Sequence, residues 1–417
     1  MKYFPAYRKS YLFIIMIISL CFLLIQCIDR GRRKNDTSEI ENSKFNEFAG
    51  SESCRKCHAQ VYNDFILTGH YSTSTPASAH SILGSFEKGK NTFHYRKGLY
   101  VSMEKTDSGF YQVEYVDSIR KIARRFDITV GSGERGQTYL SWQGNLLTLL
   151  PVSYLTSTNS WANNPGQHNQ IFFDAPVSAT CLQCHTSYAE VTPFRLVNAP
   201  EEFNPKKIIY GISCERCHGP AAQHVAYQTE NPGDKSGKFV IKSSTFSRTQ
   251  SLDMCAVCHG GRIKNLKPPF SFQSGDRLSE FYQFDTLGTN NLIDVHGNQY
   301  GLLKKSKCFQ TSQLTCITCH SPHKNEEGNL RLFSQKCMTC HNEEHGTFCK
   351  INPVPKSISA NCIDCHMPEQ PSKAIVLQLE NNKIPTAQLL RTHDIAIYSA
   401  ATKEFLKNEH SPANQLE

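Results

Sequence analysis

The pentapeptide Cys-x-x-Cys-His occurs seven times in this chain of 417 residues and constrains its fold more than any other feature. The repeats begin at Cys54, Cys181, Cys214, Cys255, Cys316, Cys337 and Cys362. Two thiols three residues apart can each form a thioether with a vinyl group of one haem, and the histidine that follows then lies under the iron. Each repeat therefore predicts one covalently attached c-type haem, and we predict seven haems in all.

Fourteen of the 18 cysteines are predicted attachment points: Cys54, Cys57, Cys181, Cys184, Cys214, Cys217, Cys255, Cys258, Cys316, Cys319, Cys337, Cys340, Cys362 and Cys365. The predicted first axial ligands of the irons are His58, His185, His218, His259, His320, His341 and His366. The remaining cysteines are Cys21, Cys27, Cys308 and Cys349. Since c-type haem is attached outside the cytoplasm, in an oxidising compartment, this cysteine usage predicts an exported protein.

A set of zinc ribbons is the alternative interpretation of paired cysteines. Residues 316–340 read C-x2-C-x17-C-x2-C, which is a spacing found in zinc ribbons. Ribbons use cysteine pairs in twos, however, and seven pairs leave one unmatched. Ribbons also do not require a histidine directly after every second cysteine. The repeats therefore favour haem over zinc.

The spacing of the repeats limits what kind of core the chain can build. The first two repeats begin 127 residues apart, whereas the last three begin at intervals of 21 and 25 residues. Segments this short cannot each enclose an apolar core, so we expect the haems themselves to form the core. The predicted fold class is a mainly α and irregular multihaem cytochrome c fold with a small β-rich insertion near residues 91–156.

Alternating apolar and polar residues support that insertion. Residues 99–103 and 110–115 alternate around the turn signal Asp107-Ser108-Gly109, which predicts a hairpin. A second predicted hairpin pairs residues 138–143 with 146–150 across Gly144-Asn145. Packing over haem edges is favoured as the role of the insertion, ahead of a docking surface or a substrate site.

We predict six segments along the chain. They are an export signal, lipoprotein signal or anchor at 1–27, a polar tether at 28–48, a first haem segment at 49–90, the β-rich insertion at 91–156, a six-haem core at 157–370 and a C-terminal wrapping arm at 371–417. The arm is expected to end in a helix over residues 396–408.

The N-terminus has the pattern of an export signal. Basic residues precede an apolar run at 11–25, which is short for a membrane-spanning helix. The run ends in Leu24-Ile25-Gln26-Cys27, which resembles a bacterial lipoprotein cleavage box except that Gln26 replaces the usual small residue. A lipid on Cys27, or alternatively an uncleaved anchor helix, would tether the protein to a membrane. Either predicts the periplasm or the outer cell surface.

The formal net charge of +8 does not indicate a nucleic-acid partner. Each ferric haem with two imidazole ligands contributes about one negative charge once its propionates are counted. Seven haems would cancel or reverse the excess of basic residues. The expected partners are therefore redox proteins that donate or accept electrons.

A second histidine on an iron separates an electron carrier from an enzyme with an open site. Ten histidines lie outside the repeats: His70, His80, His94, His168, His224, His296, His323, His345, His393 and His410. His323 follows His320 too closely to reach the same iron, and His70, on a short helix after His58, points away from its own haem. The four histidines nearest to a repeat, His70, His224, His323 and His345, are therefore predicted second ligands of neighbouring haems. His80 and His410 are expected to be solvated.

Four segments resemble the multihaem cytochromes of the cytochrome c-552/c-554 type. They are Gly50-Ser51-Glu52-Ser53-Cys54 with Tyr62, Phe65, Thr68 and His70; Ile212 to Pro220 with His224; Leu314 to His323; and Cys362 to Pro368. The wider superfamily contains nitrite reductase and hydroxylamine oxidoreductase. This chain departs from the nitrite reductases because it has no Cys-x-x-Cys-Lys sequence.

The resemblance implies haems that are stacked or set edge to edge, most of them with two histidine ligands. It implies His296 and His393 as further second ligands, beside His70, His224, His323 and His345. Six such histidines serve seven predicted haems, so one position stays open. His168, His94, water or a substrate could fill it.

Cys308 and Cys349 flank the fifth and sixth repeats. A disulfide between them would clamp this region, and export makes such a bond chemically reasonable. Two free thiols are the alternative.

These observations favour an exported heptahaem cytochrome that relays electrons between redox partners, with no catalytic side chain. The alternative is a multihaem oxidoreductase in which one haem keeps an open face and reduces or oxidises a small nitrogen or sulfur compound. A third hypothesis is a non-catalytic subunit of a larger complex.

Overall fold

The computed structural model describes residues 43–165, 167, 170–193, 199–284, 293–351, 356–380 and 384–409. The chain divides into two units, Met1–Ala49 and Gly50–Glu417. In the first unit the described part contains the 3-10 helix η1 (Lys44–Glu47), and the Ser43 hydroxyl accepts a hydrogen bond from the Phe45 N–H at its start. The predicted signal and most of the predicted tether lie outside the described residues. Among the helices of the described ranges, none is both long and apolar enough to cross a membrane.

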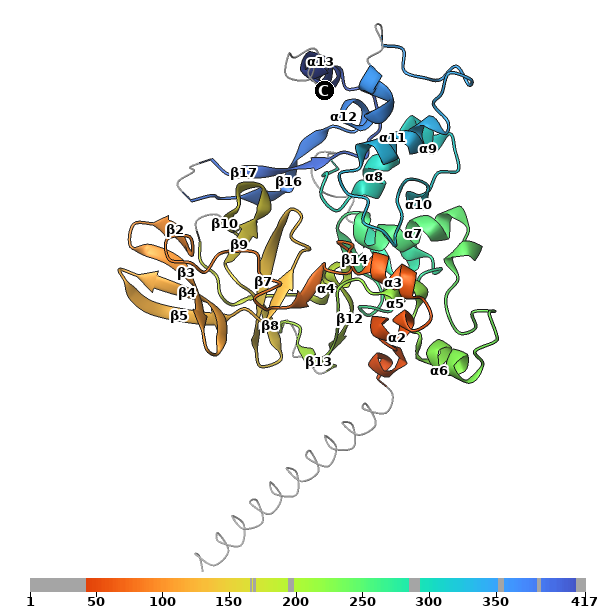
Figure 1. Ribbon diagram of the computed structural model, residues 1–417. Coiled ribbons are helices and arrows are strands. Elements are labelled where there is room, and N and C mark those ends of the chain that lie inside the picture. Colours follow the sequence, from red (N-terminus) through yellow and green to blue (C-terminus); the bar gives the residue numbers. More distant parts are fainter. Residues whose placement is uncertain are drawn as a thin grey trace, which may run out of the picture. The chain divides into compact units, whose positions relative to one another are not determined.

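The prediction of a mainly α and irregular fold is wrong. The described residues form seventeen strands in five sheets, and most helices last one or two turns (Figure 1). The longest motif-bearing helix is α7 (Arg248–His259), with 12 residues. The reason is local: a Cys-x-x-Cys-His repeat requires only one helical turn to bring its two cysteines to one face, so the repeats do not require long helices.

A four-stranded antiparallel sheet forms the outer part of the β-rich region. Its order is β2 (Thr92–Arg96), β3 (Leu99–Thr106), β4 (Gly109–Val116) and β5 (Ile119–Arg125). β3 and β4 pair from Leu99↔Val116 to Thr106↔Gly109, which confirms the first predicted hairpin. The β4–β5 turn places Asp117 and Ser118 at φ values of 48° and 66°, as a tight hairpin turn requires.

A seven-stranded sheet packs beside it. Its strands are β1 (Ser74–Pro76), β6 (Ile128–Val130), β7 (Gly136–Gln143), β8 (Leu146–Leu149), β9 (Val152–Leu155), β10 (Ser160–Asn163) and β11 (Ala175–Pro176). β7 and β8 pair across Gly144-Asn145, which confirms the second predicted hairpin. Because β1, β10 and β11 belong to this sheet, β structure extends beyond the predicted limits of 91–156 on both sides.

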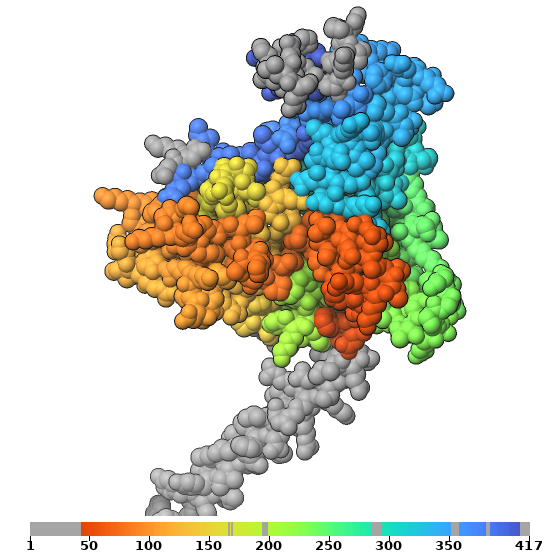
Figure 2. All heavy atoms as spheres, in the orientation of Figure 1, coloured from red at the N-terminus to blue at the C-terminus, as the bar shows by residue number. Residues whose placement is uncertain are grey.

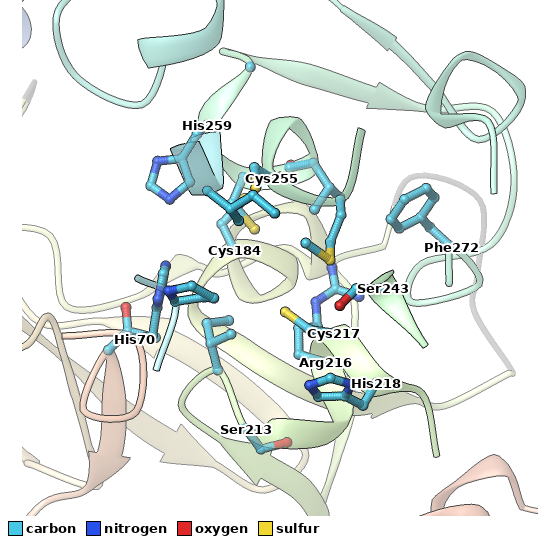
Figure 3. A pocket seen from close by; sticks show the side chains of 18 of the residues that line it. His70, Cys184, Ser213, Arg216, Cys217, His218, Ser243, Cys255, His259 and Phe272 are labelled. Carbon is cyan, nitrogen blue, oxygen red and sulfur yellow. Dashed lines mark hydrogen bonds between the residues drawn. The ribbon is translucent and has the colours of Figure 1, made fainter. Parts of the chain in front are cut away.

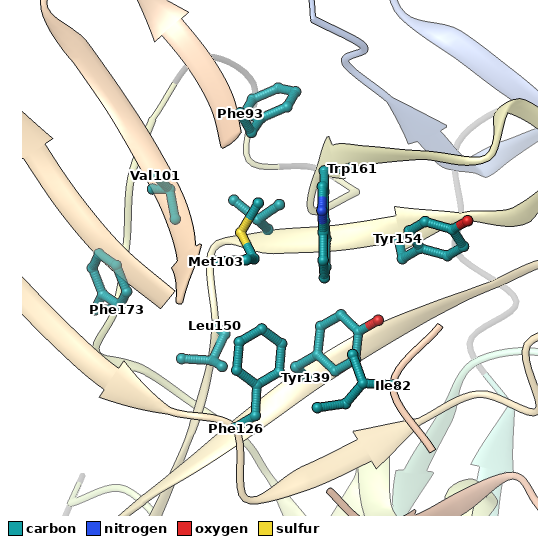
Figure 4. Packing of buried hydrophobic residues seen from close by; sticks show 11 residues of the cluster. Ile82, Phe93, Val101, Met103, Phe126, Tyr139, Leu150, Tyr154, Trp161 and Phe173 are labelled. Carbon is teal, nitrogen blue, oxygen red and sulfur yellow. The ribbon is translucent and has the colours of Figure 1, made fainter. Parts of the chain in front are cut away.

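Aromatic and aliphatic side chains fill the space between these sheets (Figure 4). Met103 from β3, Tyr139 from β7 and Trp161 from β10 meet in one buried cluster. Gly84 lets the chain approach the Trp161 indole, because a Cβ atom at Gly84 would lie 2.1 Å from its Cζ2 atom. This part of the chain therefore has an apolar core made of its own side chains.

Three further two-stranded sheets lie among or after the repeats. They are β12 (Thr186–Val191) with β13 (Phe203–Tyr210), β14 (Ile263–Asn265) with β15 (Tyr282–Phe284), and β16 (Glu369–Leu377) with β17 (Thr386–Arg391). The predicted C-terminal arm thus contains a hairpin before helix α13 (Ser399–Glu409). Its blue strands lie near the yellow segment that contains β10 in Figure 2, where Leu377 packs on Leu155 and Ala162.

Each repeat lies on or at the end of a short helix. The helices that contain repeat residues are α2 (Ser51–Arg55), α4 (Ala179–His185), α5 (Cys214–His218), α7, α10 (Cys316–Cys319), α11 (Leu330–Met338) and α12 (Ile363–His366). The remaining helices are α3 (Ala59–Phe65), α6 (Ala222–Glu230), α8 (Gln299–Leu303), α9 (Lys307–Gln310), and the 3-10 helices η2 (Thr156–Thr158), η3 (Ser243–Thr245), η4 (Leu278–Glu280) and η5 (Lys356–Ala360). One helical turn fixes the spacing between the two cysteines.

Two carboxyl groups meet between the β-rich region and the segment that follows the fifth repeat. Glu134 hydrogen-bonds to Glu327, and the Glu327 carboxylate lies 4.0 Å from the Arg135 guanidinium. Burial, together with the neighbouring Glu327, raises the pKa of Glu134 to about 7. The folded protein therefore retains a proton that the unfolded chain releases at lower pH.

We expect the free energy of unfolding to decrease as the pH rises from 4.5, the ordinary pKa of glutamate, to about 7. The contribution of Glu134 is complete below this range and is lost as its folded-state carboxyl group ionises. Glu134→Gln should flatten this slope, because glutamine keeps a hydrogen-bond donor and does not titrate. Denaturant unfolding across this pH range measures the slope, with Glu87→Gln as the control at an exposed site. A slope that is unchanged in Glu134→Gln would contradict the assignment.

Candidate haem sites

One large cavity collects the residues of the first four repeats. Its volume is about 2210 Å³, whereas a site for one small ligand measures about 300–1,000 Å³. The lining includes Cys54, His58, Cys181, Cys184, His185, Cys214, Cys217, His218, Cys255, Cys258 and His259, and also His70, His224, His296 and His323. In Figure 3, the side chains of His70, His218, His259, Cys184, Cys217 and Cys255 gather around this space. The cavity has room for several large planar ligands.

Three repeat histidines face a second histidine from a distant segment. The ring centroids of His218 and His323 lie 6.1 Å apart with an interplanar angle of 8°. The His259 and His70 centroids are also 6.1 Å apart. The same separation, 6.1 Å, joins His320 and His393. Each pair combines one predicted first ligand with one predicted second ligand.

This separation matches two imidazoles on opposite sides of one metal ion. A metal–nitrogen bond of about 2 Å on each side, with each ring centre about 1 Å beyond its nitrogen, gives roughly 6 Å between centroids. Direct ring contact is not needed to explain the spacing. The residues present therefore fit a haem iron held between each pair.

The environments of these imidazoles favour the neutral form, which is the form that binds metals. Burial, and then the charge of His259, lowers the pKa of His70 to about 4. Burial, and then His320, lowers the pKa of His393 to about 4. Burial, and then the charge of His296, lowers the pKa of His185 to about 4, and burial also lowers the pKa of His296, which lies close to His259 as well.

Hydrogen bonds to the Nδ1 atoms leave the opposite ring nitrogens free. His218 bonds through Nδ1 to the Ile241 carbonyl (3.1 Å), His341 to the Thr347 carbonyl (3.3 Å) and His366 to the Ala396 carbonyl (2.9 Å). Because a carbonyl only accepts, Nδ1 must carry the proton in each ring. Nε2 then has a free lone pair for a metal, as in metal-binding histidines generally.

Cysteines of different repeats lie side by side. A hydrogen bond to the Cys214 thiol raises the pKa of Cys54 far above its ordinary value, and Cys258 and Cys316 have the same effect on Cys184 and Cys255, respectively. Burial, and then the neighbouring Cys362 and Cys319, raises the pKa of Cys337 to about 12. Since these thiols are the predicted attachment points, neighbouring repeats would hold neighbouring haems.

Three comparisons with known proteins agree with this geometry. Residues 154–219 match the family described as "Cytochrome c554 and c-prime". Multiheme cytochrome MtrA of Shewanella baltica (strain OS185) is 26% identical over 197 residues, which cover 45% of this chain and 52% of MtrA. The crystal structure of outer cell wall cytochrome OcwA matches with a TM-score of 0.50 and 16% identity, covering 82% of each chain.

This chain is similar to multihaem c-type cytochromes. It spans about half the length of the curated relative that it matches. At 16% identity, the likeness to OcwA concerns the fold alone. The fold of this chain combines short motif helices with several sheets. The prediction of a mainly α and irregular fold was therefore wrong.

Other histidines lie elsewhere. His94, a candidate for the open position, lies on β2, where it forms a short contact with Glu380 and its ring is 5.1 Å from the Tyr100 ring. His345 is exposed on the segment after the sixth repeat. In the described part of the chain, no comparable ring pair includes His58, His185, His341 or His366. His168 and His410 lie outside the described residues.

The structure does not join Cys308 to Cys349. Their neighbours differ. The charge of Cys308 helps to raise the pKa values of Cys319 and Cys337. The charge of Cys349 helps to raise those of Cys362 and Cys365. The two thiols therefore lie beside different repeats.

The alternative interpretation of the repeats as zinc ribbons finds no support in the described residues. All six cysteine and histidine side chains of the fifth and sixth repeats lie within the described ranges. No group of three or more His, Cys, Asp or Glu side chains in those ranges is arranged to hold a metal ion by itself. The ribbon-like spacing at 316–340 thus does not bring four ligands together.

Several residues around the site could not be found from the sequence. The Gln299 side chain bonds His259 Nδ1 at 3.1 Å, and Thr73 Oγ1 lies 3.4 Å from His185 Nδ1. Buried Glu215 accepts from the N–H groups of Gly50 and Ala221, both at 2.9 Å, and so ties the first repeat to the third. Of these residues, only Glu215 could have been singled out from the sequence, because it lies within a repeat.

Proposed function

We propose that this chain is an exported heptahaem c-type cytochrome that relays electrons between redox partners. The observation that carries the proposal is the spacing of three histidine pairs, each of which joins the histidine of a repeat to one from a distant segment. Bound haem supplies reversible one-electron exchange at its iron. The chain fixes the spacing of the sites and supplies their axial imidazoles.

A network of the predicted haem sites follows from the neighbouring cysteines. The first repeat adjoins the third through Cys54 and Cys214, and the third adjoins the fourth through Cys217 and Cys258. The second repeat also adjoins the fourth, through Cys184 and Cys258, and the fourth adjoins the fifth. Besides burial, the charges of Cys362 and Cys319 raise the pKa of Cys337, which supports a place for the sixth repeat near the fifth and the seventh. The proposed path runs through repeats one, three, four, five, six and seven, with repeat two as a branch at repeat four.

The histidine pairs supply the proposed second ligands. We assign His323 to the third repeat, His70 to the fourth and His393 to the fifth, in keeping with the three ring pairs. We assign His296 to the second repeat, since its charge, besides burial, lowers the pKa of His185. His224 is assigned to the first repeat, since it lines the same cavity as His58 and the other three repeats at this cavity already have an assigned partner. His345 serves one of the last two repeats.

The proposed second ligands also join distant segments of the chain and keep water away from the irons. Each assigned pair joins segments that are far apart in the sequence, such as His70 and His259. The buried, neutral imidazoles exclude water from the irons and disfavour uncompensated charge. Relay between closely spaced centres then requires no side chain that acts as an acid or nucleophile.

Export and membrane tethering belong to the same proposal. The outer cell wall location in the name of OcwA supports a place outside the cytoplasm. A lipid on Cys27 or an anchor helix within residues 1–27 would provide the tether. The proposed relationship to the hydroxylamine oxidoreductase and nitrite reductase superfamily rests on the motif resemblance.

Haem content and carbon monoxide binding test the function together. We expect the purified, full-length chain to contain seven covalent haems, to titrate in reversible one-electron steps, and to bind no carbon monoxide at the six haems that have an assigned second histidine. A stoichiometric shift of one haem by carbon monoxide would favour the oxidoreductase instead. Colourless protein, or protein with zinc in place of iron, would exclude both.

A further inference from the structure

The loop at residues 234–242, here called the clamp loop, binds two of these histidines at once. The Nδ1 atom of His218 bonds to the Ile241 carbonyl at 3.1 Å, and that of His224 bonds to the Lys238 carbonyl at 2.7 Å. The Ile241 N–H in turn donates to the His218 carbonyl at 2.9 Å. His218 points toward the cavity in Figure 3.

Both hydrogen bonds fix the same tautomer. A carbonyl oxygen only accepts, so each Nδ1 carries its proton and each Nε2 keeps a lone pair. A hydrogen bond from Nδ1–H to a carbonyl also makes the imidazole a better electron donor to a bound metal. The clamp loop therefore determines both the direction and the donor strength of two rings.

A polar cluster holds the clamp loop against helix α6. The Asp234 carboxylate accepts from the Tyr227 hydroxyl at 2.7 Å and from the Ser236 N–H at 2.8 Å, and lies 3.5 Å from Lys238 Nζ. Lys238 Nζ donates to the Tyr227 hydroxyl at 2.8 Å and lies 4.7 Å from the centre of its ring. Tyr227 and Asp234 thus position the backbone whose carbonyls reach the histidines.

The backbone of the clamp loop is not that of a relaxed loop. Phe239 lies at φ 58°, in the left-handed region that side-chain-bearing residues rarely adopt. The centres of the Phe239 and Tyr227 rings lie 5.6 Å apart. In sequence, Phe239 stands between Lys238 and Ile241, whose carbonyl groups bind the histidines. Such a conformation persists only where surrounding contacts hold it, so a loss of contacts at Tyr227 should be transmitted to both carbonyls.

We propose that the clamp loop is a shared positioning element for the axial ligands of two neighbouring haems, those of the first and third repeats. Tyr227 and Asp234 act as positioning residues, since the contacts described for them are with the loop and not with either histidine. The inference rests on the proposed function, because it takes His218 and His224 as iron ligands. It goes beyond that function by coupling two sites through one loop.

Tyr227→Phe tests the coupling with the smallest change. It removes the hydroxyl group and keeps the ring that packs on Phe239. We expect two of the midpoint potentials to move together to more positive values, because weaker Nδ1–H bonds make poorer donors, with changed electron paramagnetic resonance g-values for the same two haems. Asp234→Ala, a second variant, should move the same two haems further in the same direction.

Tyr115→Phe is the matched control, because the Tyr115 hydroxyl donates to Glu104 at 2.8 Å in the four-stranded sheet. It should leave every potential unchanged. Unchanged potentials in both clamp-loop variants at full haem content, or a shift of only one haem, would overturn the inference. A wild-type protein without haem would instead overturn the proposed function on which it rests.

Discussion

Replacing His323 by alanine is expected to leave one of seven haems without its second axial ligand. The His323 and His218 rings stand 6.1 Å apart and almost parallel, so the iron at the third repeat would depend on His323 for its sixth ligand. Loss of this imidazole should turn one low-spin haem high-spin and raise its potential, since a strong donor is removed. Carbon monoxide binding should rise by about one molecule per chain.

His70→Ala and His393→Ala should each have the same effect on a different haem, because their partners are His259 and His320. His80→Ala is the control, since His80 is exposed. Visible and electron paramagnetic resonance spectra of the reduced and oxidised proteins measure the change. Fully low-spin spectra for His323→Ala would contradict its assignment as a ligand.

Removal of the fourth haem is expected to disturb more of the protein than removal of the second. The fourth repeat adjoins three others through Cys255 and Cys258, whereas the Cys184 contact links the second repeat to the fourth. The double variant Cys255→Ser, Cys258→Ser should therefore change the potentials of three remaining haems. Cys181→Ser, Cys184→Ser, the matched control, should change one.

The same comparison tests the order of the relay. Without the fourth haem, the first and third sites lose their proposed connection to the fifth, so electron transfer along the chain should stop there. Without the second haem, the main path stays intact. Redox titration of each six-haem protein, after its haem content is confirmed, counts the sites that shift. Equal numbers of shifted haems in the two variants would contradict the proposed branch.

The attachment chemistry could be predicted from the sequence because that chemistry is local. Two cysteines and a histidine on one helical turn need no information from elsewhere in the chain. The prediction that His323 serves a different iron also used local geometry, since it follows His320 so closely. Its partner, His218, could not be derived, because that pairing depends on how segments over 100 residues apart meet.

The fold class was wrong for a physical reason that particular strands make clear. β3 and β4 alternate regularly and flank a strong turn signal, and they were predicted. β16 and β17 have a register shift and include Pro371, a residue that weakens a strand signal. Their pairing is supported by tertiary contact, since Leu377 packs on Leu155 and Ala162. The carbonyls that orient His218 and His224 left no signal either, because every residue has a carbonyl.

The separate apolar core of the β-rich region has a consequence for biogenesis. Met103, Tyr139 and Trp161 form this core without any contribution from a prosthetic group. The cavity that is lined by the first four repeats is large, about 2210 Å³, and a smaller apolar cluster that includes Val257 and Phe272 packs at its wall. When haem supply falls short, the two regions should therefore mature unequally: the two sheets of the β-rich region fold, while the region of the repeats stays accessible to proteases. A truncated, colourless fragment that retains the sheets would be the signature of iron-limited cells.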